Sequence, residues 1–145
     1  MKTVHRCLRI RTGPGIALLD VTPDIHELVA ESGVESGFVT VTSRHTTTAV
    51  TINENEERLL ADTRRFLADL APADAPYLHN DIHLRDCPPD EPRNAHAHLL
   101  AMLVGSSEVV PIVAGKLELG RWQSVLLVEF DGPRERTLSL RVWGE

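Results

Sequence analysis

The last third of the chain is a run of short apolar segments separated by glycine and proline. Four segments, residues 108–114, 116–119, 122–131 and 136–143, predict strands, with breaks at Gly115, Gly120 and Gly132-Pro133. Parallel strands need a crossover connection of a dozen or more residues, usually a helix, and these breaks are too short for one. The pattern therefore favours antiparallel pairing over a doubly wound parallel sheet.

The first 104 residues predict a mixture of strands and helices. We expect an opening hairpin of strands 5–11 and 16–21, followed by a helix of about ten residues that Thr22 caps, with Pro23 at its first position and Gly33 at its end. Strands are then expected over 37–43 and 49–52, a helix over about 54–70 capped by Asn53 with Glu56 as its capping-box partner, and a helix over 94–104. Together with the terminal strands, this predicts one α+β domain, residues 1–145, dominated by antiparallel pairing.

Residues 71–93 connect the second and third predicted helices. They contain five prolines, which exclude regular structure over most of the segment. The run Tyr77-Leu78-His79-Asn80-Asp81-Ile82-His83 is too apolar and aromatic for a linker. We expect an ordered loop or a lid that packs against the rest of the domain.

Composition excludes several classes of protein. A formal charge of −6 argues against a nucleic-acid partner, because phosphate-backbone binding requires a basic surface. No apolar run approaches the roughly 20 residues that span a bilayer, and the start lacks the apolar segment of a secretory signal, so we expect no membrane partner and a cytoplasmic protein. Cys7 and Cys87 are far apart, which indicates neither a disulfide framework nor a thiolate zinc site.

Residues 43–57 concentrate polar side chains between a strand and a helix. The alternation over 37–43 places His45 at a strand end, while Asn53, Glu54 and Asn55 lie near a helix start. Strand ends and helix N-termini can hold side chains and free N–H groups toward a ligand, including an anion. The alternative is that Thr46 to Thr48 are ordinary strand residues and that Asn53 is only a cap.

Seven histidines in 145 residues are many. On a helix, the side chains of His96 and His98 point about 200° apart, so one ion cannot bind both, and only His98 shares a face with Asn94. His45, His79 and His98 could together hold a zinc-like ion with an open coordination position. The alternative is that His98 is a hydrogen-bonded structural residue, and the spacing does not show whether the three rings meet.

The strand predicted over 122–131 is apolar on both faces. Glu129 is therefore a carboxylate in an apolar setting, which must be paired, hydrogen-bonded or neutralised. A structural ion pair with Arg134 or Arg136 and a role in a site are both open.

Six motifs, taken in order, resemble those of the YjbQ family, also called secondary thiamine-phosphate synthases. They are His45-Thr46-Thr47, Ile52-Asn53-Glu54-Asn55, Tyr77-Leu78-His79, Asn94-Ala95-His96-Ala97-His98-Leu99, Leu119-Gly120-Arg121-Trp122-Gln123 and Val128-Glu129-Phe130-Asp131-Gly132-Pro133-Arg134. The resemblance runs from about residue 10 to the C-terminus. Arg121 is a departure, because the family usually has Thr there.

The resemblance implies a twisted, mostly antiparallel sheet curled into a sandwich or barrel with two to three helices. It also implies a homotrimer with a site near the subunit boundary. The functional positions carried over are His45, Asn53, Glu54, His79, Asn94, His98 and the Trp122-Gln123 pair, with the three histidines as metal ligands.

The activity that the resemblance implies is a transferase reaction, the coupling of a hydroxymethylpyrimidine diphosphate to a thiazole phosphate to form thiamine phosphate. Departure of pyrophosphate is normally served by Mg²⁺ on oxygen ligands, whereas three histidines favour zinc. We therefore also consider a metal-dependent hydrolase with Glu54 or Glu129 as general base, and a non-catalytic trimeric protein that binds a small anion or metal. A small phosphorylated substrate or anion is the expected partner.

Overall fold

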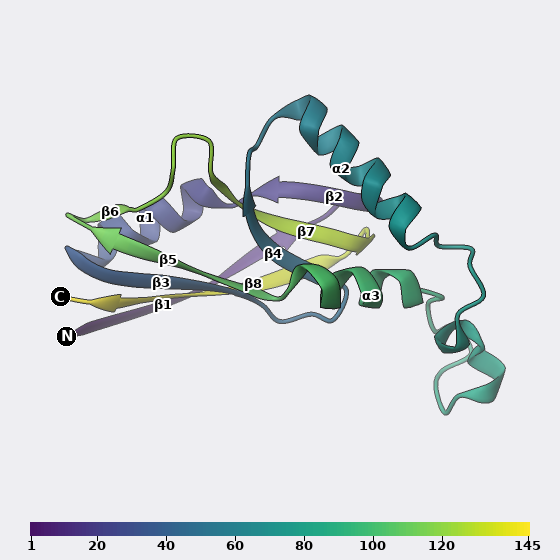
Figure 1. The fold of residues 1–145 in the computed structure, drawn as a ribbon. Coiled ribbons are helices and arrows are strands. Elements are labelled where there is room, and N and C mark those ends of the chain that lie inside the picture. Colours follow the sequence, from purple (N-terminus) through teal and green to yellow (C-terminus); the bar gives the residue numbers. More distant parts are fainter.

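In the computed structural model, which describes residues 1–145, the chain forms eight strands and three α-helices (Figure 1). The strands are β1 (Lys2–Arg11), β2 (Gly15–Asp20), β3 (Ser36–Ser43), β4 (Thr48–Asn53), β5 (Ser107–Val113), β6 (Lys116–Leu117), β7 (Ser124–Gly132) and β8 (Glu135–Gly144). The helices are α1 (Thr22–Ser32), α2 (Glu57–Leu70) and α3 (Ala95–Val104), with short 3₁₀ helices η1 (Leu78–Asn80) and η2 (Ile82–Leu84).

The strands form two sheets, with orders β1-β8-β3-β5-β6 and β2-β7-β4. Every pairing is antiparallel, as the lack of room for crossover helices in the last third predicts. The predicted opening hairpin is wrong, because β1 pairs with β8 in one sheet and β2 with β7 in the other. Lys2 lies opposite Gly144 in the register of β1 and β8, so the two ends of the chain are side by side (Figure 1). The α+β class and the curled, mostly antiparallel sheet are confirmed.

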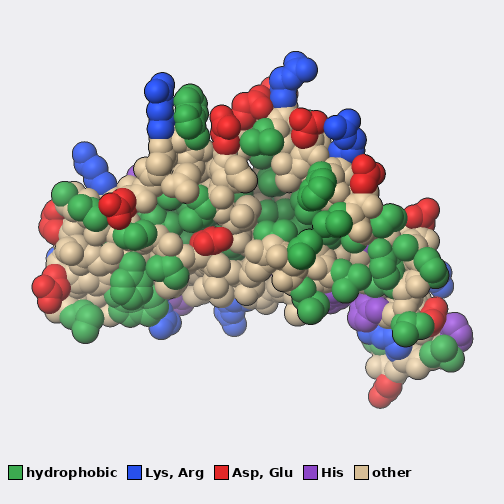
Figure 2. Space-filling view, in the orientation of Figure 1, with side chains coloured by type: hydrophobic (Ala, Val, Ile, Leu, Met, Phe, Trp, Pro, Cys, Tyr) green, Lys and Arg blue, Asp and Glu red, His purple; other side chains and the backbone are tan.

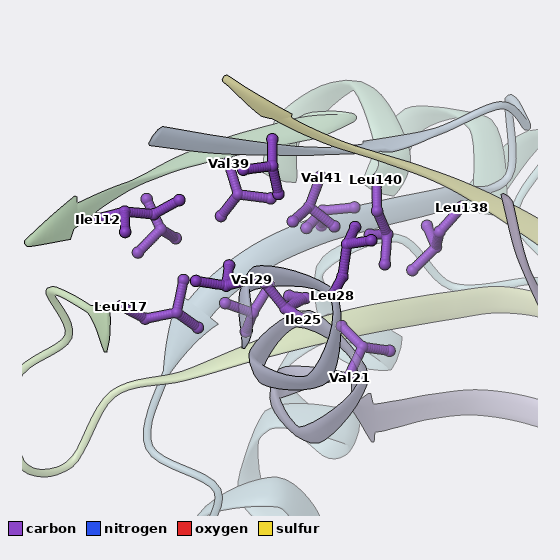
Figure 3. Close-up of a cluster of buried hydrophobic side chains, with 14 of the residues drawn as sticks. Val21, Ile25, Leu28, Val29, Val39, Val41, Ile112, Leu117, Leu138 and Leu140 are labelled. Atoms are coloured by element: carbon purple, nitrogen blue, oxygen red, sulfur yellow. The ribbon is translucent and has the colours of Figure 1, made fainter. Parts of the chain in front are cut away.

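The larger core lies between the two sheets and α1. Ile25, Leu28 and Val29 recur at helical spacing on α1, and all three are buried against inward-facing residues of β3, β5 and β8 (Figure 3). Val50 of β4 and Val125 of β7 belong to the same cluster, which therefore joins the sheets.

Of the two predicted ends of α1, the C-terminal end is confirmed and the N-terminal cap is wrong. Gly33 ends the helix in the left-handed conformation, with φ of 59°, as predicted. Thr22 was expected to cap the start, but it is the first helical residue and its Oγ1 instead accepts from the N–H of Val125 at 2.9 Å.

Strand β7 is buried on both faces, as its sequence predicts. Val125 and Leu127 face the larger core, whereas Val128 and Phe130 face a second cluster with Leu67 of α2 and residues of α3. A side chain on either face of β7 is therefore removed from water.

Helix α2 begins three residues later than predicted. Asn53 ends β4, and the residue that caps the helix is Glu56, whose carboxylate accepts from the N–H groups of Arg58 and Leu59 at 2.9 and 2.8 Å. These two backbone bonds lower the pKa of Glu56. A carboxylate can satisfy two free N–H groups at once and favours the positive end of the helix, so Glu56 replaces the predicted capping box.

Helix α3 begins after Asn94 and ends at Gly105, in agreement with the prediction. The loop over 71–93 contains only η1 and η2 as regular structure, and its His79 ring lies against the His98 ring of α3. It is thus an ordered loop that packs on the domain. No helix of the chain combines the length and apolar character that crossing a bilayer requires.

Candidate functional site

A polar hollow of about 710 Å³ lies at one end of the sandwich. Three segments form it: the turn between β3 and β4, the turn between β7 and β8, and the chain leading into α3. Its walls hold no apolar side chain except prolines, and the lining residues are Arg44, His45, Thr46, Thr47, Glu91, Pro92, Asn94, His98, Asp131, Pro133, Arg134, Glu135 and Arg136.

The floor of this hollow is a buried ion pair. Arg136 donates from Nε to the Glu129 carboxylate at 2.6 Å and from Nη2 to its second oxygen, and the two side chains are 4% and 0% exposed. Arg136 Nη2 also donates to Thr47 Oγ1 at 2.8 Å, while Thr12 Oγ1 donates to Glu129 at 2.7 Å. Of the two partners considered from the sequence, Arg136 is the one that pairs with Glu129.

The hydrogen bonds that Glu129 accepts keep its side chain deprotonated. Burial acts to raise the pKa of Glu129, but the hydrogen bonds from Arg136, the Asp131 N–H and Thr12 outweigh it, so the pKa is lowered. Glu129 is therefore a carboxylate at neutral pH and fixes Arg136 as a rigid cation.

One nitrogen of Arg136 has no partner within the chain. Its Nε and Nη2 make all of its hydrogen bonds, and Nη1 makes none. Nη1 is not among the buried polar atoms that lack a partner, so it reaches solvent, and Arg136 lines the hollow. A nearly buried guanidinium thus presents a free donor edge to the cavity.

Asp131 lines the same hollow. It accepts from Asn94 Nδ2 at 2.7 Å and from Arg134 Nε and Nη2 at 3.1 and 2.8 Å. The charge of Asp131 is therefore compensated, and the Asn94 amide is oriented by it. Asn94 Oδ1 is buried and has no hydrogen-bond donor in the chain.

His45 is anchored to the neighbouring strand. Its Nε2 accepts from the N–H of Thr137 at 2.9 Å, so in the neutral ring Nδ1 carries the proton. Burial first, and then the charge of Arg136, lower the pKa of His45. The ring is thus a neutral hydrogen-bond donor at neutral pH.

His98 and His79 form a pair. Their ring centroids are 4.8 Å apart with the planes at 73°, and His79 Nε2 is buried without a partner. Burial, followed by the influence of His79, lowers the pKa of His98. His98 is therefore also neutral at neutral pH, with its ring on the wall of the hollow.

The chain does not form the predicted three-histidine ion site. A metal ligand must offer a free nitrogen lone pair, but Nε2 of His45 is occupied by the Thr137 N–H and its Nδ1 is protonated. No group of three or more His, Cys, Asp and Glu side chains is arranged to hold an ion. The donors present do not fit a zinc-like or magnesium ion bound by His45, His79 and His98.

The other predicted site residues fall into two groups. His45, Asn94 and His98 line the hollow, Glu129 lies beneath it, and His79 touches His98. Asn53 lies opposite Ser124 in the register of β4 and β7, whereas Thr48 lies opposite Glu129, so Asn53, Glu54 and Gln123 are at the other end of these strands. Gln123 there accepts from the N–H of Gly120 at 2.7 Å and closes its own turn.

Arg44, Thr47, Asp131 and Arg136 line the hollow without having been predicted as site residues. For Arg136 a signal exists: it has the same parity on β8 as the buried Leu138, Leu140 and Val142, so it points inward. The other three carry no comparable pattern.

Comparison with known proteins identifies the family of this chain. The family model described as UPF0047 protein YjbQ-like matches residues 6–145. The chain belongs to the YjbQ (UPF0047) family. A UPF0047 protein of Methanothermobacter thermautotrophicus is 41% identical over 145 residues, covering 100% of this chain and 95% of its own, and YugU of Bacillus subtilis is 31% identical over 140 residues, covering 96% and 98%.

Solved structures of similar proteins have the same fold. A YbjQ-like protein of unknown function from Sulfolobus solfataricus superposes with a TM-score of 0.89 at 32% identity, covering 99% of each chain. A hypothetical protein from Aeropyrum pernix K1 gives a TM-score of 0.89 at 39% identity, covering 98% of this chain and 99% of its own.

The prediction of a thiamine-phosphate synthase with a histidine-rich metal site is wrong. The resemblance to the YjbQ family is confirmed, but that family is described without an activity and its Sulfolobus member as of unknown function. The metal site on which the prediction depended is not formed by the chain. The metal-dependent hydrolase depended on the same ion and loses its basis, and of the non-catalytic protein that binds a small anion or metal only the metal-binding form does.

Proposed function

We propose that the polar hollow binds a small molecule that carries a phosphate or a similar anionic group. The observation that supports this most directly is the free Nη1 edge of Arg136, a guanidinium held almost completely out of water by Glu129 and Thr47. The two N–H groups of Nη1 can donate charge-assisted hydrogen bonds to phosphate oxygens, and such bonds are stronger than those between neutral groups. Because Arg136 is already fixed, little conformational entropy is lost when an anion binds to it.

Arg44 supplies a second cation. It is exposed, it lines the hollow, and it makes no ion pair within the chain. Two of the three acidic side chains in the lining are compensated, Asp131 by Arg134 at 2.8 Å and Glu91 by the more distant Arg85 at 3.9 Å, whereas the exposed Glu135 makes no ion pair. Arg44 is thus available to a ligand without breaking an existing pair.

Neutral donors complete the proposed anion site. The proton on Nδ1 of His45 and the hydroxyl groups of Thr46 and Thr47 lie on the same walls. Hydrogen bonds from such groups to a charged ligand are stronger than those to a neutral one. The site does not require a metal ion to attract an anion.

The experiment is a calorimetric titration of the full-length protein with inorganic phosphate, repeated for Arg44→Ser and for Arg121→Ser as the matched control. Arg121 is also an exposed arginine, but it stacks on Trp122 at 4.7 Å and lies outside the hollow. We expect Arg44→Ser to weaken binding by about tenfold, the effect of losing one charge-assisted hydrogen bond, and Arg121→Ser to leave it unchanged. Equal effects of the two substitutions would contradict the proposal.

We also propose that the chain associates with copies of itself, as a trimer. Helix α2 supports this, because Leu59, Phe66 and Leu70 form a stripe at helical spacing that is 36, 64 and 49% exposed, while only Leu67 of that helix is buried. Figure 2 shows hydrophobic side chains gathered over α2 and α3.

Light scattering on the eluting protein tests this assembly. Phe66→Glu should lower the mass toward that of a single chain, and Arg64→Glu, a charge change at an exposed neighbouring position, should not. A wild-type protein with the mass of one chain at high concentration would refute the assembly without bearing on the anion site.

A further inference from the structure

A second hollow adjoins the first. It has a volume of about 530 Å³ and shares Arg44, His45, Thr46 and His98 with the polar hollow. The turn between β3 and β4 and the His98 ring are therefore a common wall. A ligand in one hollow lies next to the other.

The two hollows differ in chemistry. The second is floored by the last turn of α3, where Ala101, Met102 and Gly105 contribute to its lining. Met102 is 81% exposed. A flexible, polarizable thioether in this position adapts to the shape of an apolar group and contacts aromatic rings favourably.

Two hydroxyl groups of the second hollow, those of Ser43 and Thr48, are already paired within the chain. Ser43 Oγ bonds to Thr48 Oγ1 and accepts from the N–H of His45 at 3.2 Å. These hydroxyl groups have little capacity left for a ligand. Arg44, Thr46 and Ser106 remain as donors, and Arg44 and Thr46 also line the polar hollow, where a charge would be placed.

We propose that the ligand of this site is bipartite, with an anionic group in the polar hollow joined to an uncharged, preferably aromatic group that lies on Met102 and Ala101. Arg44 and Arg136 hold the anion, and α3 holds the apolar part. This inference rests on the proposed function and specifies its ligand class as organic phosphates, or similar anions, that bear one apolar substituent. The shared wall formed by His45 and His98 lies next to the bond that joins the two parts.

The test compares three probes on the full-length wild-type protein: inorganic phosphate, methyl phosphate and phenyl phosphate. Burying much of one phenyl ring is expected to give phenyl phosphate about tenfold higher affinity than methyl phosphate. Met102→Ala should reduce this ratio to about threefold, because it removes part of the apolar contact. Leu103→Ala is the matched control, since Leu103 is 67% exposed on the same turn but lines neither hollow.

The outcomes separate the two proposals. If phosphate binds and the phenyl group adds no affinity, the bipartite ligand is refuted and the anion site stands. If Met102→Ala and Leu103→Ala lower the ratio equally, the apolar contact is not in the second hollow and the inference is overturned. If none of the three probes binds, the proposed function itself fails.

Discussion

Replacing Glu129 by glutamine would leave Arg136 as a buried cation without its counter-charge. Glutamine has nearly the shape of glutamate, so the substitution creates no cavity and isolates the effect of charge. As whole residues Glu129 is 0% exposed and Arg136 3%, so solvent reaches the guanidinium only at Nη1 and compensates little of its charge. The amide can still accept one hydrogen bond from Arg136, but its NH₂ group would face another N–H donor where Glu129 accepts from both Nε and Nη2.

Loss of one partner from a buried ion pair costs about 3–5 kcal/mol, because the remaining charge stays desolvated. The pair here has nearly complete burial and two direct contacts, which places Glu129→Gln within that range. With a urea m-value of about 2 kcal/mol per molar, the unfolding midpoint should fall by about 1.5–2.5 M. Glu135→Gln is the control, since this exposed carboxylate at the rim of the same hollow should change stability by less than about 0.5 kcal/mol.

Urea unfolding followed by circular dichroism measures both variants. The double variant Glu129→Gln, Arg136→Met should be more stable than Glu129→Gln alone, because it removes the unpaired charge as well. An unfolding midpoint for Glu129→Gln within 0.5 M of the wild type would refute the reasoning, because that difference corresponds to a loss of only about 1 kcal/mol in the free energy of unfolding. A double variant less stable than the single one would show that Arg136 contributes through packing and not through its charge.

Two further predictions concern the same end of the sandwich. His45 and His98 have lowered pKa values, so the unfolded chain binds protons more readily than the folded one once the pH falls below the ordinary value of 6.5. The free energy of unfolding should therefore decrease from pH 7 to pH 5, and it should decrease less in His98→Gln. Urea titration at each pH measures both. Gly132→Ala should destabilise the protein by about 1–3 kcal/mol, because the new Cβ would lie 2.0 Å from the Gly13 carbonyl oxygen; a melting temperature equal to that of the wild type would contradict the close approach.

The sequence carries the information that sets the sheet and most of the helix ends. Short glycine breaks exclude parallel crossovers between the last strands, although only β5 and β6 of these pair with each other, and an apolar pattern on both faces of β7 requires a layer on each side. The start of α2 is less determined, because Asn53 and Glu56 are both able to cap a helix. The structure selects Glu56, since Asn53 is needed as the last residue of β4.

The site is harder to predict from the sequence than the fold, because hydrogen bonds between distant segments determine which atoms of each side chain are free to bind a ligand. His45, His79 and His98 come from a strand turn, a proline-rich loop and a helix, and residue type alone makes them equivalent candidates for a metal. The Thr137 N–H, 92 positions from His45 along the chain, occupies the nitrogen that an ion would need. A local pattern cannot encode that contact.

The alternation of inward and outward residues along a strand identifies more of the site residues than the number of histidines does. Arg136 points inward on β8 together with Leu138 and Leu140, and Glu129 lies on a strand with no solvent-exposed face, so each charge needs a partner inside the molecule. Their pairing leaves one edge of the guanidinium uncovered by the chain. A cation that the fold has already desolvated and oriented gains more from an anion than a flexible surface arginine does. The buried pair thus accounts for the proposed affinity of this end of the sandwich for an anion, and for the destabilisation expected when one member of the pair is replaced.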